Sequence, residues 1–361
     1  MIRHENASLK IAPPGSWPLI SVIVVNYNGA KYLPDCLGSL QNASYPRFEI
    51  LVVENGSLDE SAAILTALAS QNSAVVPILS SRNLGYAGAV NLAMRTARGS
   101  YAVVLNMDVT VTPQWLEPLI QVLESRKDVG AVCPLVALTD RSRINAMGQD
   151  IHVSGLGFNR GLGLPVQRAG SEPFRVSGIQ GAAFAISRSL WEEIGGLDES
   201  GFLYHEDVNL SWLLHLRGLE LYCAPASIVC HDYFLSMHPA KLYLLERNRW
   251  ALLSTHMRLG TRILFSPLLL LTEFLMWTYC ASQGISFLRA KWRSCRWVWG
   301  RKAELQKRRA KIEKLRVRTD WEVLKGLSWS YHIRQFLTLG RERGLSRRQP
   351  HGGIPEEMSD R

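Results

Sequence analysis

The first third of the chain alternates apolar strand-like runs with helical patterns, and this alternation constrains the fold more than any other feature. The runs read LISVIVVNYN, FEILVVEN, AVVPILS and YAVVLNMD, and helical patterns near residues 30–41, 59–70 and 87–98 separate them. Continuous apolar strands joined by helices of about a dozen residues are typical of βαβ units, whose mostly parallel sheet is covered on both faces. The sequence therefore predicts an α/β domain that begins near Pro18.

Polar turns end three of these strands. They are Asn26-Tyr27-Asn28, Glu54-Asn55-Gly56-Ser57 and Asn106-Met107-Asp108. Ligands of such sheets bind beyond the C-terminal ends of the strands, so we expect the binding cleft there. A further segment, NLGYAGAVN, enters a helix with Gly85 and Gly88, which allow a ligand close to the backbone. It is neither a GxGxxG motif nor a P-loop, which disfavours a dinucleotide-dependent dehydrogenase.

The stretch GGLDESGFLYHEDVNLSWLLHLRG, residues 195–218, is unusually rich in carboxylates. Apolar residues follow at helical spacing, so Glu206 and Asp207 are expected in the first turn of an amphipathic helix. Acids at a helix N-terminus stabilise it by capping, and that structural interpretation stays open beside a catalytic one. We expect Asp198 and Glu199 to be turn residues that follow the Gly195-Gly196 end of the preceding helix.

A metal site is the second chemical possibility. Asp108 closes the strand YAVVLNMD, and Mg²⁺ or Mn²⁺ is typically held by one or two carboxylates together with phosphate oxygens of the substrate. Asp108 could instead cap the helix that begins near Pro113. His231 ends the later run SIVCHD and is either a second metal ligand or a structural histidine.

Positive charge is concentrated near the C-terminal end. The formal net charge is +10, and residues 286–318 contain thirteen Lys or Arg against two Glu. Residues 263–288, which carry Glu273 as their one charge, have the length and hydrophobicity of a bilayer span. The basic residues on both sides, with Pro267, favour instead a helix or helical hairpin lying in an anionic membrane interface, through residues 263–318. The alternative is a buried core helix with a solvated basic tail, and we expect no nucleic-acid partner.

Cysteine usage and chain organisation complete this interpretation. Six cysteines without a CxxC pair indicate reduced thiols, and the polar first residues lack the apolar core of a secretory signal. We therefore expect a cytoplasmic protein attached to the inner face of the membrane. The expected segments are an extension at 1–17, the α/β domain at 18–235, a helical membrane-associating region at 236–330 and a partly disordered tail at 331–361.

An ordered set of motifs resembles the family 2 glycosyltransferases of the GT-A fold, in particular their rhamnosyltransferase-like branch. The motifs are SVIVVNYN, VVENGSLDES, NLGYAGAVNLA, LNMDVTV, GAAFAISRSLWEEIGGLDE, YHEDVNLSWLLHLRG and SIVCHDY, and the later LLERNR is also similar. The resemblance implies an inverting enzyme that uses Mn or Mg to move a sugar, such as rhamnose, from a dTDP- or UDP-sugar to a glycan or lipid-linked glycan.

The resemblance also implies roles for individual residues. Asp207 would be the catalytic base with Glu206 in reserve, and Asp108 would bind metal and diphosphate, with His231 as a candidate ligand. The nucleotide-sugar site would contain Val25, Asn26, Tyr27, Glu54, Asn55, Asn83, Gly85, Asn91 and Asn106. The acceptor side would contain Gly181, Asp198, Tyr204 and Trp212, although aromatic residues there could equally be core.

Two departures from the family pattern bear on these roles. Glu54 stands where the family usually has Asp, which affects the nucleoside contact. The metal motif begins with Asn106 rather than an acid, which leaves Asp108 with fewer protein partners and makes His231 more plausible. Two other functions remain open: a non-catalytic membrane-bound scaffold, and a nucleotidyltransferase, for which the turn after the first strand lacks a basic phosphate-binding signature.

Overall fold

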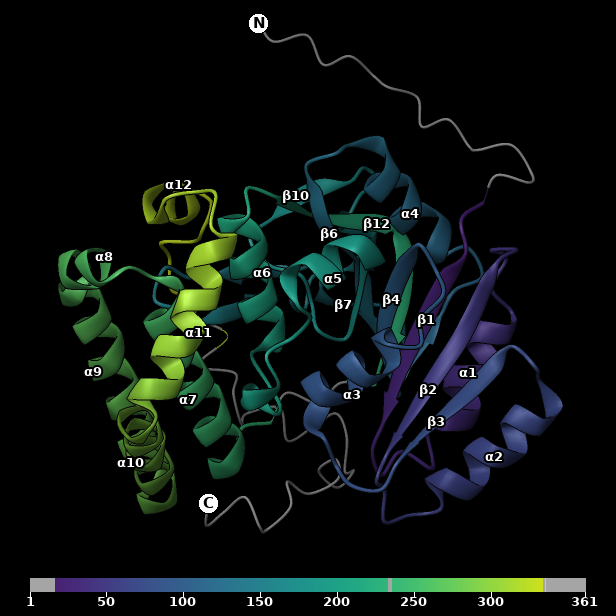
Figure 1. Ribbon diagram of the computed structural model, residues 1–361, viewed down its shortest axis with the longest axis horizontal. Helices are drawn as coiled ribbons and strands as arrows, with labels where there is room; N and C mark the ends of the chain where they lie inside the picture. The colour runs from purple at the N-terminus through teal and green to yellow at the C-terminus, as the bar shows by residue number, and fades with distance from the viewer. Residues whose placement is uncertain (1–16, 233–235, 334, 336–361) are drawn as a thin grey trace, which may run out of the picture.

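The computed structural model describes residues 17–232, 236–333 and 335. Residues 1–16 of the extension expected at 1–17, and residues 334 and 336–361 of the tail expected at 331–361, lie outside this part. A ten-stranded sheet forms the centre, in the order β10-β12-β6-β11-β4-β1-β2-β3, with β5 and β7 paired at its side (Figure 1). The strands of its first half are β1 (Ile20–Asn26), β2 (Phe48–Asn55), β3 (Val75–Ser80) and β4 (Tyr101–Asn106). All pairings among these four are parallel, which confirms the predicted sheet.

Helices cover both faces of this sheet because successive side chains of each strand point to opposite faces. One face packs against α1 (Leu33–Gln41), α2 (Ser61–Gln71) and α4 (Leu116–Ser125). The other packs against α3 (Gly85–Met94), α5 (Arg188–Ile194) and α6 (Glu206–Leu216). In β1, for example, Val24 belongs to the first cluster and Ile23 to the second. The two buried layers fix the strands, and hence their polar ends, in register.

The second half of the sheet is mixed. Its strands are β5 (Val109–Val111), β6 (Val129–Leu138), β7 (Ile144–Ala146), β10 (Phe174–Val176), β11 (Ala183–Ser187) and β12 (Glu220–His231), and β8 (Gln149–Ile151) pairs separately with β9 (Gly157–Asn159). Strand β11 runs antiparallel between β4 and β6, whereas β12 is parallel to β6. Short 3-10 turns occupy Val166–Arg168 and Glu199–Gly201.

Strand β12 is longer than the run SIVCHD, which up to His231 forms its last part. It is one continuous strand whose register against β6 shifts between Ala224 and Ile228. The irregularity absorbs the residues between them, and the Ser227 hydroxyl donates to the carbonyl of Trp115. After this bulge, β12 also pairs with β5, and His231 stands opposite Val109.

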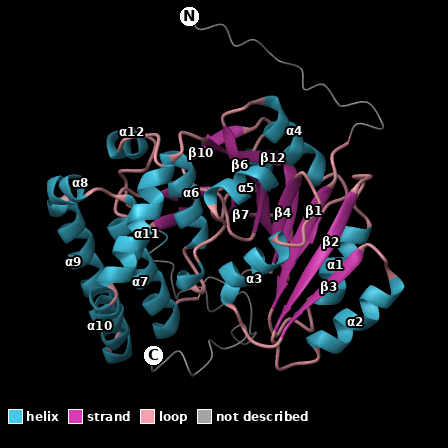
Figure 2. Cartoon of the chain, in the orientation of Figure 1, coloured by secondary structure: helices cyan, strands magenta, loops and turns pink. Residues whose placement is uncertain are grey.

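The remaining helices gather at the end of the molecule opposite β3 (Figure 2). They are α7 (Pro239–His256), α8 (Leu259–Leu264), α9 (Ser266–Gln283), α10 (Ile285–Gly300), α11 (Lys302–Leu315) and α12 (Asp320–Lys325). Gly284, at φ +105°, separates α9 from α10, so the expected apolar segment is a pair of helices joined by a tight turn. Among the described residues no helix has the length and apolar character needed to cross a bilayer.

Candidate active site

The ends of β1 and β2 form a closed hydrogen-bonded turn at the expected nucleoside position. The Asn26 amide donates to Glu54 Oε2 at 2.6 Å, and the Ser57 backbone N–H donates to Glu54 Oε1 at 2.7 Å. Glu54 therefore has both oxygens engaged in holding the turn, which a shorter Asp could not reach in the same way. The Asn26 Oδ1 atom is buried and has no hydrogen-bond partner among the described residues. An unsatisfied buried polar atom of this kind is costly and calls for an explanation.

Val25 and Tyr27, which were also predicted for the nucleotide-sugar site, have different surroundings. Val25 is 8% exposed and belongs to the core cluster under α3. The Tyr27 backbone N–H lies 3.3 Å from the sulfur of Met107, so the first and fourth strand ends are in contact.

The segment at the start of α3 links the β2 end to a distant loop. Asn55 Oδ1 accepts from the Leu84 N–H at 2.9 Å, and Asn83 Oδ1 accepts from the Gly85 N–H at 2.8 Å. Gly85 has φ +74°, and a Cβ there would lie 2.4 Å from the carbonyl oxygen of Phe202. Only glycine therefore permits α3 to approach the loop before α6 this closely.

Asn91 acts on the same loop. Its side chain donates to the Leu197 carbonyl at 2.8 Å and to Glu199 Oε1 at 3.0 Å, and it accepts from the Leu197 N–H at 3.0 Å. These contacts engage both ends of the Asn91 amide. In this arrangement the predicted donor-site residue orients the loop that leads to α6.

Asp108 and His231 meet at the sheet edge although they are far apart in sequence. Their closest atoms, Asp108 Oδ1 and His231 Nε2, are 3.3 Å apart, and His231 Nδ1 lies 3.3 Å from Asn145 Oδ1. Asn106 Oδ1 and Asn145 Nδ2 are buried without a hydrogen-bond partner among the described residues. No group of three or more His, Cys, Asp or Glu that could hold a metal occurs within the described ranges. A carboxylate and an imidazole nonetheless suit a divalent ion that takes its other ligands from substrate phosphate and water.

Glu206 and Asp207 begin α6, as predicted, and face different surroundings. Asp207 Oδ2 accepts from the Gln149 side-chain amide at 2.7 Å and from the Gly181 N–H at 3.0 Å. Glu206 instead lines a small cavity of about 20 Å³ with Asn209 and Arg308. Adjacent residues on a helix do not share a face, which explains this separation.

The electrostatics of the pair follow from burial and mutual repulsion. Burial, followed by the charge of Asp207, raises the pKa of Glu206 to about 8. Burial also raises the pKa of Asp207, while the Val208 and Gly181 N–H groups act in the opposite direction by stabilising its charged form. Burial therefore acts against the charged form of both acids, whereas the hydrogen bonds from Gln149 and Gly181 stabilise the charged form of Asp207.

Tyr86 lies near both pairs of candidate residues, Asp108 with His231 and Glu206 with Asp207. Its hydroxyl donates to the Gly181 carbonyl at 2.8 Å. Its pKa is raised well above the usual range, first by burial and then by the negative charges of Glu206, Asp207 and Asp108. The Gly181 N–H donates to Asp207 Oδ2, and the next residue, Ala182, accepts from the Asn106 N–H at 3.0 Å through its carbonyl. The first turn of α6 and the end of β4, two residues before Asp108, therefore lie against the same short segment.

The loop before α6 is strained and is held from α7. Phe202, Tyr204 and His205 all have positive φ, between 61° and 72°, which non-glycine residues rarely adopt. The Asn248 amide donates to the carbonyls of Gly201, Leu203 and Tyr204, with the Gly201 and Tyr204 contacts at 2.9 and 2.8 Å.

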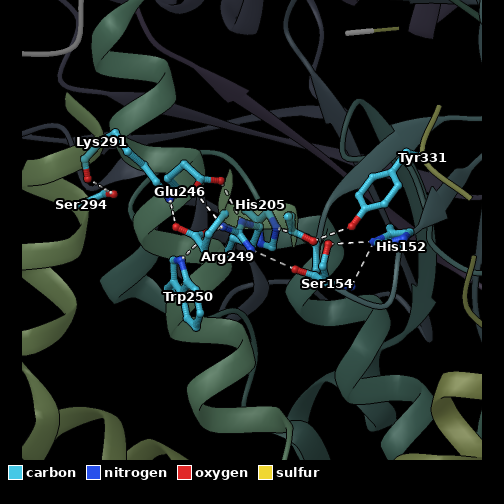
Figure 3. A network of polar contacts seen from close by, with 12 residues as sticks. His152, Ser154, His205, Glu246, Arg249, Trp250, Lys291, Ser294 and Tyr331 are labelled. Atoms are coloured by element: carbon cyan, nitrogen blue, oxygen red, sulfur yellow. Dashed lines mark hydrogen bonds and ion pairs between the residues drawn. The ribbon is translucent and has the colours of Figure 1, made fainter. Parts of the chain in front are cut away.

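A buried network extends this support into the C-terminal helices (Figure 3). Arg249 is paired with Glu246 and donates to the Ser154 carbonyl at 3.2 Å. The neighbouring Gly155 carbonyl lies 2.8 Å from His205 Nε2, directly before α6. The helices after the sheet therefore position the first turn of α6.

Two predicted acceptor-side residues have other surroundings. Trp212 is 2% exposed and packs in a cluster of α6, α7 and α12 side chains, so the expectation of an acceptor platform is wrong for this ring. Asp198 accepts from the Ser200 N–H at 3.1 Å and is paired with Arg308, which confirms it as a turn residue. Tyr204 is partly buried beside Glu206 and Lys241.

Sequence reasoning missed Asn145, Gln149 and Asn248. The first two lie in an irregular Gly-rich region without periodicity, and only the contacts with His231 and Asp207 reveal them. Asn248 lies in the LLERNR segment, whose similarity to the family was the one available signal.

A central sheet of mostly parallel strands with helices on both faces agrees with the GT-A fold that the motifs predicted. Residues 21–195 match the model of Glycosyl transferase family 2. Residues 21–195 are therefore similar in sequence to the family 2 glycosyltransferases.

One curated relative shows the extent of the sequence similarity. N-acetylgalactosaminyltransferase 6 of Drosophila melanogaster is 30% identical over 228 residues, which are 60% of this chain and 34% of that protein. The chain thus spans about a third of the length of this relative.

Two solved structures share the fold. A structure of GalNAc-T7 with UDP, GalNAc and Mn²⁺ has a TM-score of 0.55 at 19% identity, over 67% of this chain and 48% of that one. The mannosyltransferase PcManGT of Pyrobaculum calidifontis, with GDP-Man and Mn²⁺, has a TM-score of 0.51 at 17% identity, over 84% of this chain and 87% of that one. The second likeness extends over most of both chains.

Proposed function

We propose that this protein is an inverting glycosyltransferase that moves a sugar from a nucleoside-diphosphate sugar to a hydroxyl of a glycan or lipid-linked glycan. The observation that carries the proposal is a pair of contacts made by neighbouring residues: the Gly181 N–H donates to Asp207, and the Ala182 carbonyl accepts from the N–H of Asn106, two residues before Asp108. These contacts support a base and a metal-binding carboxylate at the same end of the sheet. The family 2 match over residues 21–195 supports the reaction class.

The donor would lie along the C-terminal ends of β1, β2 and β4. Its nucleoside would contact the turn formed by Asn26 and Glu54, where the buried Asn26 Oδ1 offers an acceptor. Its diphosphate would reach Asp108 and His231, which we propose as ligands of Mn²⁺ or Mg²⁺. When bound, the ion would neutralise the charge that develops on the departing diphosphate.

Asp207 is the proposed base. In the transfer, the acceptor oxygen forms a bond to the anomeric carbon while the bond from that carbon to the diphosphate oxygen breaks. The acceptor proton passes to Asp207, and the nucleoside diphosphate leaves with the bonding electron pair. Gln149 and the Gly181 N–H hold Asp207 Oδ2 through hydrogen bonds, which keep the carboxylate oriented for this role. Glu206 lines a separate cavity, and its pKa is raised to about 8. A protonated Glu206 places no second negative charge beside Asp207.

The finer identity of the substrates is also a proposal. The motif resemblance suggests rhamnose from a dTDP or UDP donor and a lipid-linked glycan at the cytoplasmic face of the membrane. All six cysteines lie in the described part of the chain and none forms a disulfide, which supports a reducing compartment.

The test combines donor binding with turnover. Thermal unfolding of the purified chain is measured with dTDP-, UDP- and GDP-sugars, each with Mn²⁺ and with chelator, because a ligand at 100 times its Kd stabilises by roughly 2.7 kcal/mol. Release of nucleoside diphosphate is then measured with a membrane extract as the acceptor source. Asp207→Asn is expected to keep the donor-induced thermal shift and to lose about 10²- to 10⁴-fold in turnover. The matched control is Asp140→Asn, which changes an exposed turn acid.

Two outcomes would contradict the proposal. Wild-type turnover by folded Asp207→Asn would remove Asp207 as the base. No thermal shift with any donor, together with no turnover, would favour the non-catalytic scaffold.

A further inference from the structure

Helix α9 carries large apolar side chains on both its buried and its exposed side, which is unusual for a helix at the surface. Its inner side, with Leu269, Met276 and Cys280, is buried against the protein. Its outer side exposes large apolar side chains: Leu270 at 68%, Leu271 at 48%, Phe274 at 67% and Leu275 at 43%. A surface helix normally turns polar residues to water, so the exposed side of α9 has the composition of a surface that is usually buried against a partner.

The neighbouring helices extend this apolar surface. In α8, Ile263 and Leu264 are 65% and 72% exposed. After α9, Trp329 is 49% exposed and its ring lies 5.6 Å from that of Phe265. We call the exposed side chains of α8 and α9 the outer apolar face. It comprises Ile263, Leu264, Leu270, Leu271, Phe274 and Leu275.

Helix α10 borders the outer apolar face with tryptophans and arginines. Its exposed positions Ile285, Arg289, Trp292, Arg296 and Trp299 recur at intervals of three and four, and so form one stripe. Neither Arg289 nor Arg296 has an ion-pair partner among the described residues. Trp and Arg side chains of this kind combine an apolar body with a polar tip, which suits the headgroup region of a bilayer.

The charge on the outer surface of α8 to α10 indicates what kind of partner binds there. Glu273 is the single acid between residues 259 and 300, and it is turned inward to Arg249 and Lys291. The outer surface of α8 to α10 therefore carries cations without anions. A second copy of the chain would bring like charges together, whereas anionic lipid would satisfy both the apolar and the basic parts.

We propose that the outer apolar face and the α10 stripe dock onto the surface of an anionic bilayer, with α9 lying in the interface. The contact is narrower than the whole basic segment. In α11 and beyond, several cations turn back onto the protein: Arg308 to Asp198, Arg316 to Asp320 and Arg318 to Glu220. Trp297 likewise stacks on Arg247 and Arg301.

Flotation of the full chain with phosphatidylcholine vesicles, with and without phosphatidylglycerol, tests the proposal. Wild type is expected to float with the anionic vesicles. The variant L270D/F274D is expected to lose at least about tenfold in partitioning, because each apolar side chain contributes through burial. The variant R289E/R296E is expected to lose at least about fivefold per arginine on anionic vesicles only, because each change removes a cation and adds an anion that the lipid repels. The matched control Leu79→Asp, at a 65% exposed leucine of strand β3, is expected to float as wild type does.

Circular dichroism and thermal unfolding establish that each variant is folded. Absence of wild-type flotation, or equal flotation of folded L270D/F274D, would overturn the proposal. It would also be overturned if light scattering showed a dimer that L270D/F274D dissociates, or if RNA bound tightly through Arg289 and Arg296 while vesicles did not. The readout is independent of turnover, so its failure would leave the proposed reaction standing.

Discussion

The buried ion cluster between α7, α9 and α10 allows a quantitative test of what holds these C-terminal helices together. Glu246, Arg249 and Lys291 have side chains that are at most 2% exposed, and Glu273 is 17% exposed. Two carboxylates balance two cations. Glu246 accepts from Arg249 Nε and Nη2, both at 2.8 Å, and also contacts Lys291. Although burial alone would raise it, the pKa of Glu246 is held well below the usual range by Arg249 and Lys291.

Replacing Glu246 by Gln leaves the buried Arg249 and Lys291 with Glu273 as their single carboxylate partner. Removing one partner of a buried pair typically costs about 3 to 5 kcal/mol, because the remaining charge stays desolvated and uncompensated. We expect Lys291→Met to cost a similar amount, since it leaves an excess carboxylate. The double variant restores the balance through Arg249 and Glu273, and should cost about 1 to 3 kcal/mol less than the two single costs added together.

Urea unfolding at neutral pH, followed by tryptophan fluorescence, measures all four free energies of unfolding. The exposed Glu192→Gln, whose partner Arg188 is also exposed, is the control and should change stability by less than about 1 kcal/mol. The reasoning fails if either buried single change costs under about 1 kcal/mol. Strictly additive costs in the double variant would show that charge balance is not what the cluster supplies.

Three further expectations concern the site. Asn248→Ala should lower kcat by about tenfold or more with little change in the KM for donor. The variant releases the strained loop before α6 but leaves the turn of Asn26 and Glu54 intact. Steady-state kinetics measures kcat and KM separately. Glu206 has its pKa raised from 4.5 to about 8, so folding takes up a proton and the free energy of unfolding falls as pH rises between these values. Glu206→Gln should lack this decline in thermal unfolding from pH 5 to pH 8.5, and a parallel decline would refute the assignment. His231→Ala should lower the Mn²⁺-dependent part of the donor-induced thermal shift and leave the shift in chelator unchanged, and an unaltered Mn²⁺ response would exclude His231 as a ligand.

Much of the fold was predictable because it depends on local patterns. The apolar runs that became β1, β2 and β4 determine a buried parallel sheet, and the direction of the strands determines where their polar ends gather. The first turn of α6 was equally local, since helical spacing placed Glu206 and Asp207 there.

Other features depended on contacts between distant residues. Nothing near Asp108 in the sequence indicates that His231 will lie 3.3 Å away, because that contact requires the bulge in β12 and its pairing with β5. The acid-rich stretch likewise forms one cluster in the sequence, but its acids have separate partners in the structure. Asp198 pairs with Arg308, Glu206 lines a cavity, and Asp207 accepts a hydrogen bond from Gln149.

The charge of the C-terminal region shows the same division. Its sequence alone determined a basic, apolar and tryptophan-rich segment that suits an anionic surface. Only the tertiary structure decided which of these side chains remain outside: Lys291 is buried with Glu246 and Glu273, while Arg289 and Arg296 stay exposed. The physical reason is that hydrophobic periodicity fixes which face of a helix is buried, whereas the partner of a buried charge is set by elements that fold against it from elsewhere in the chain.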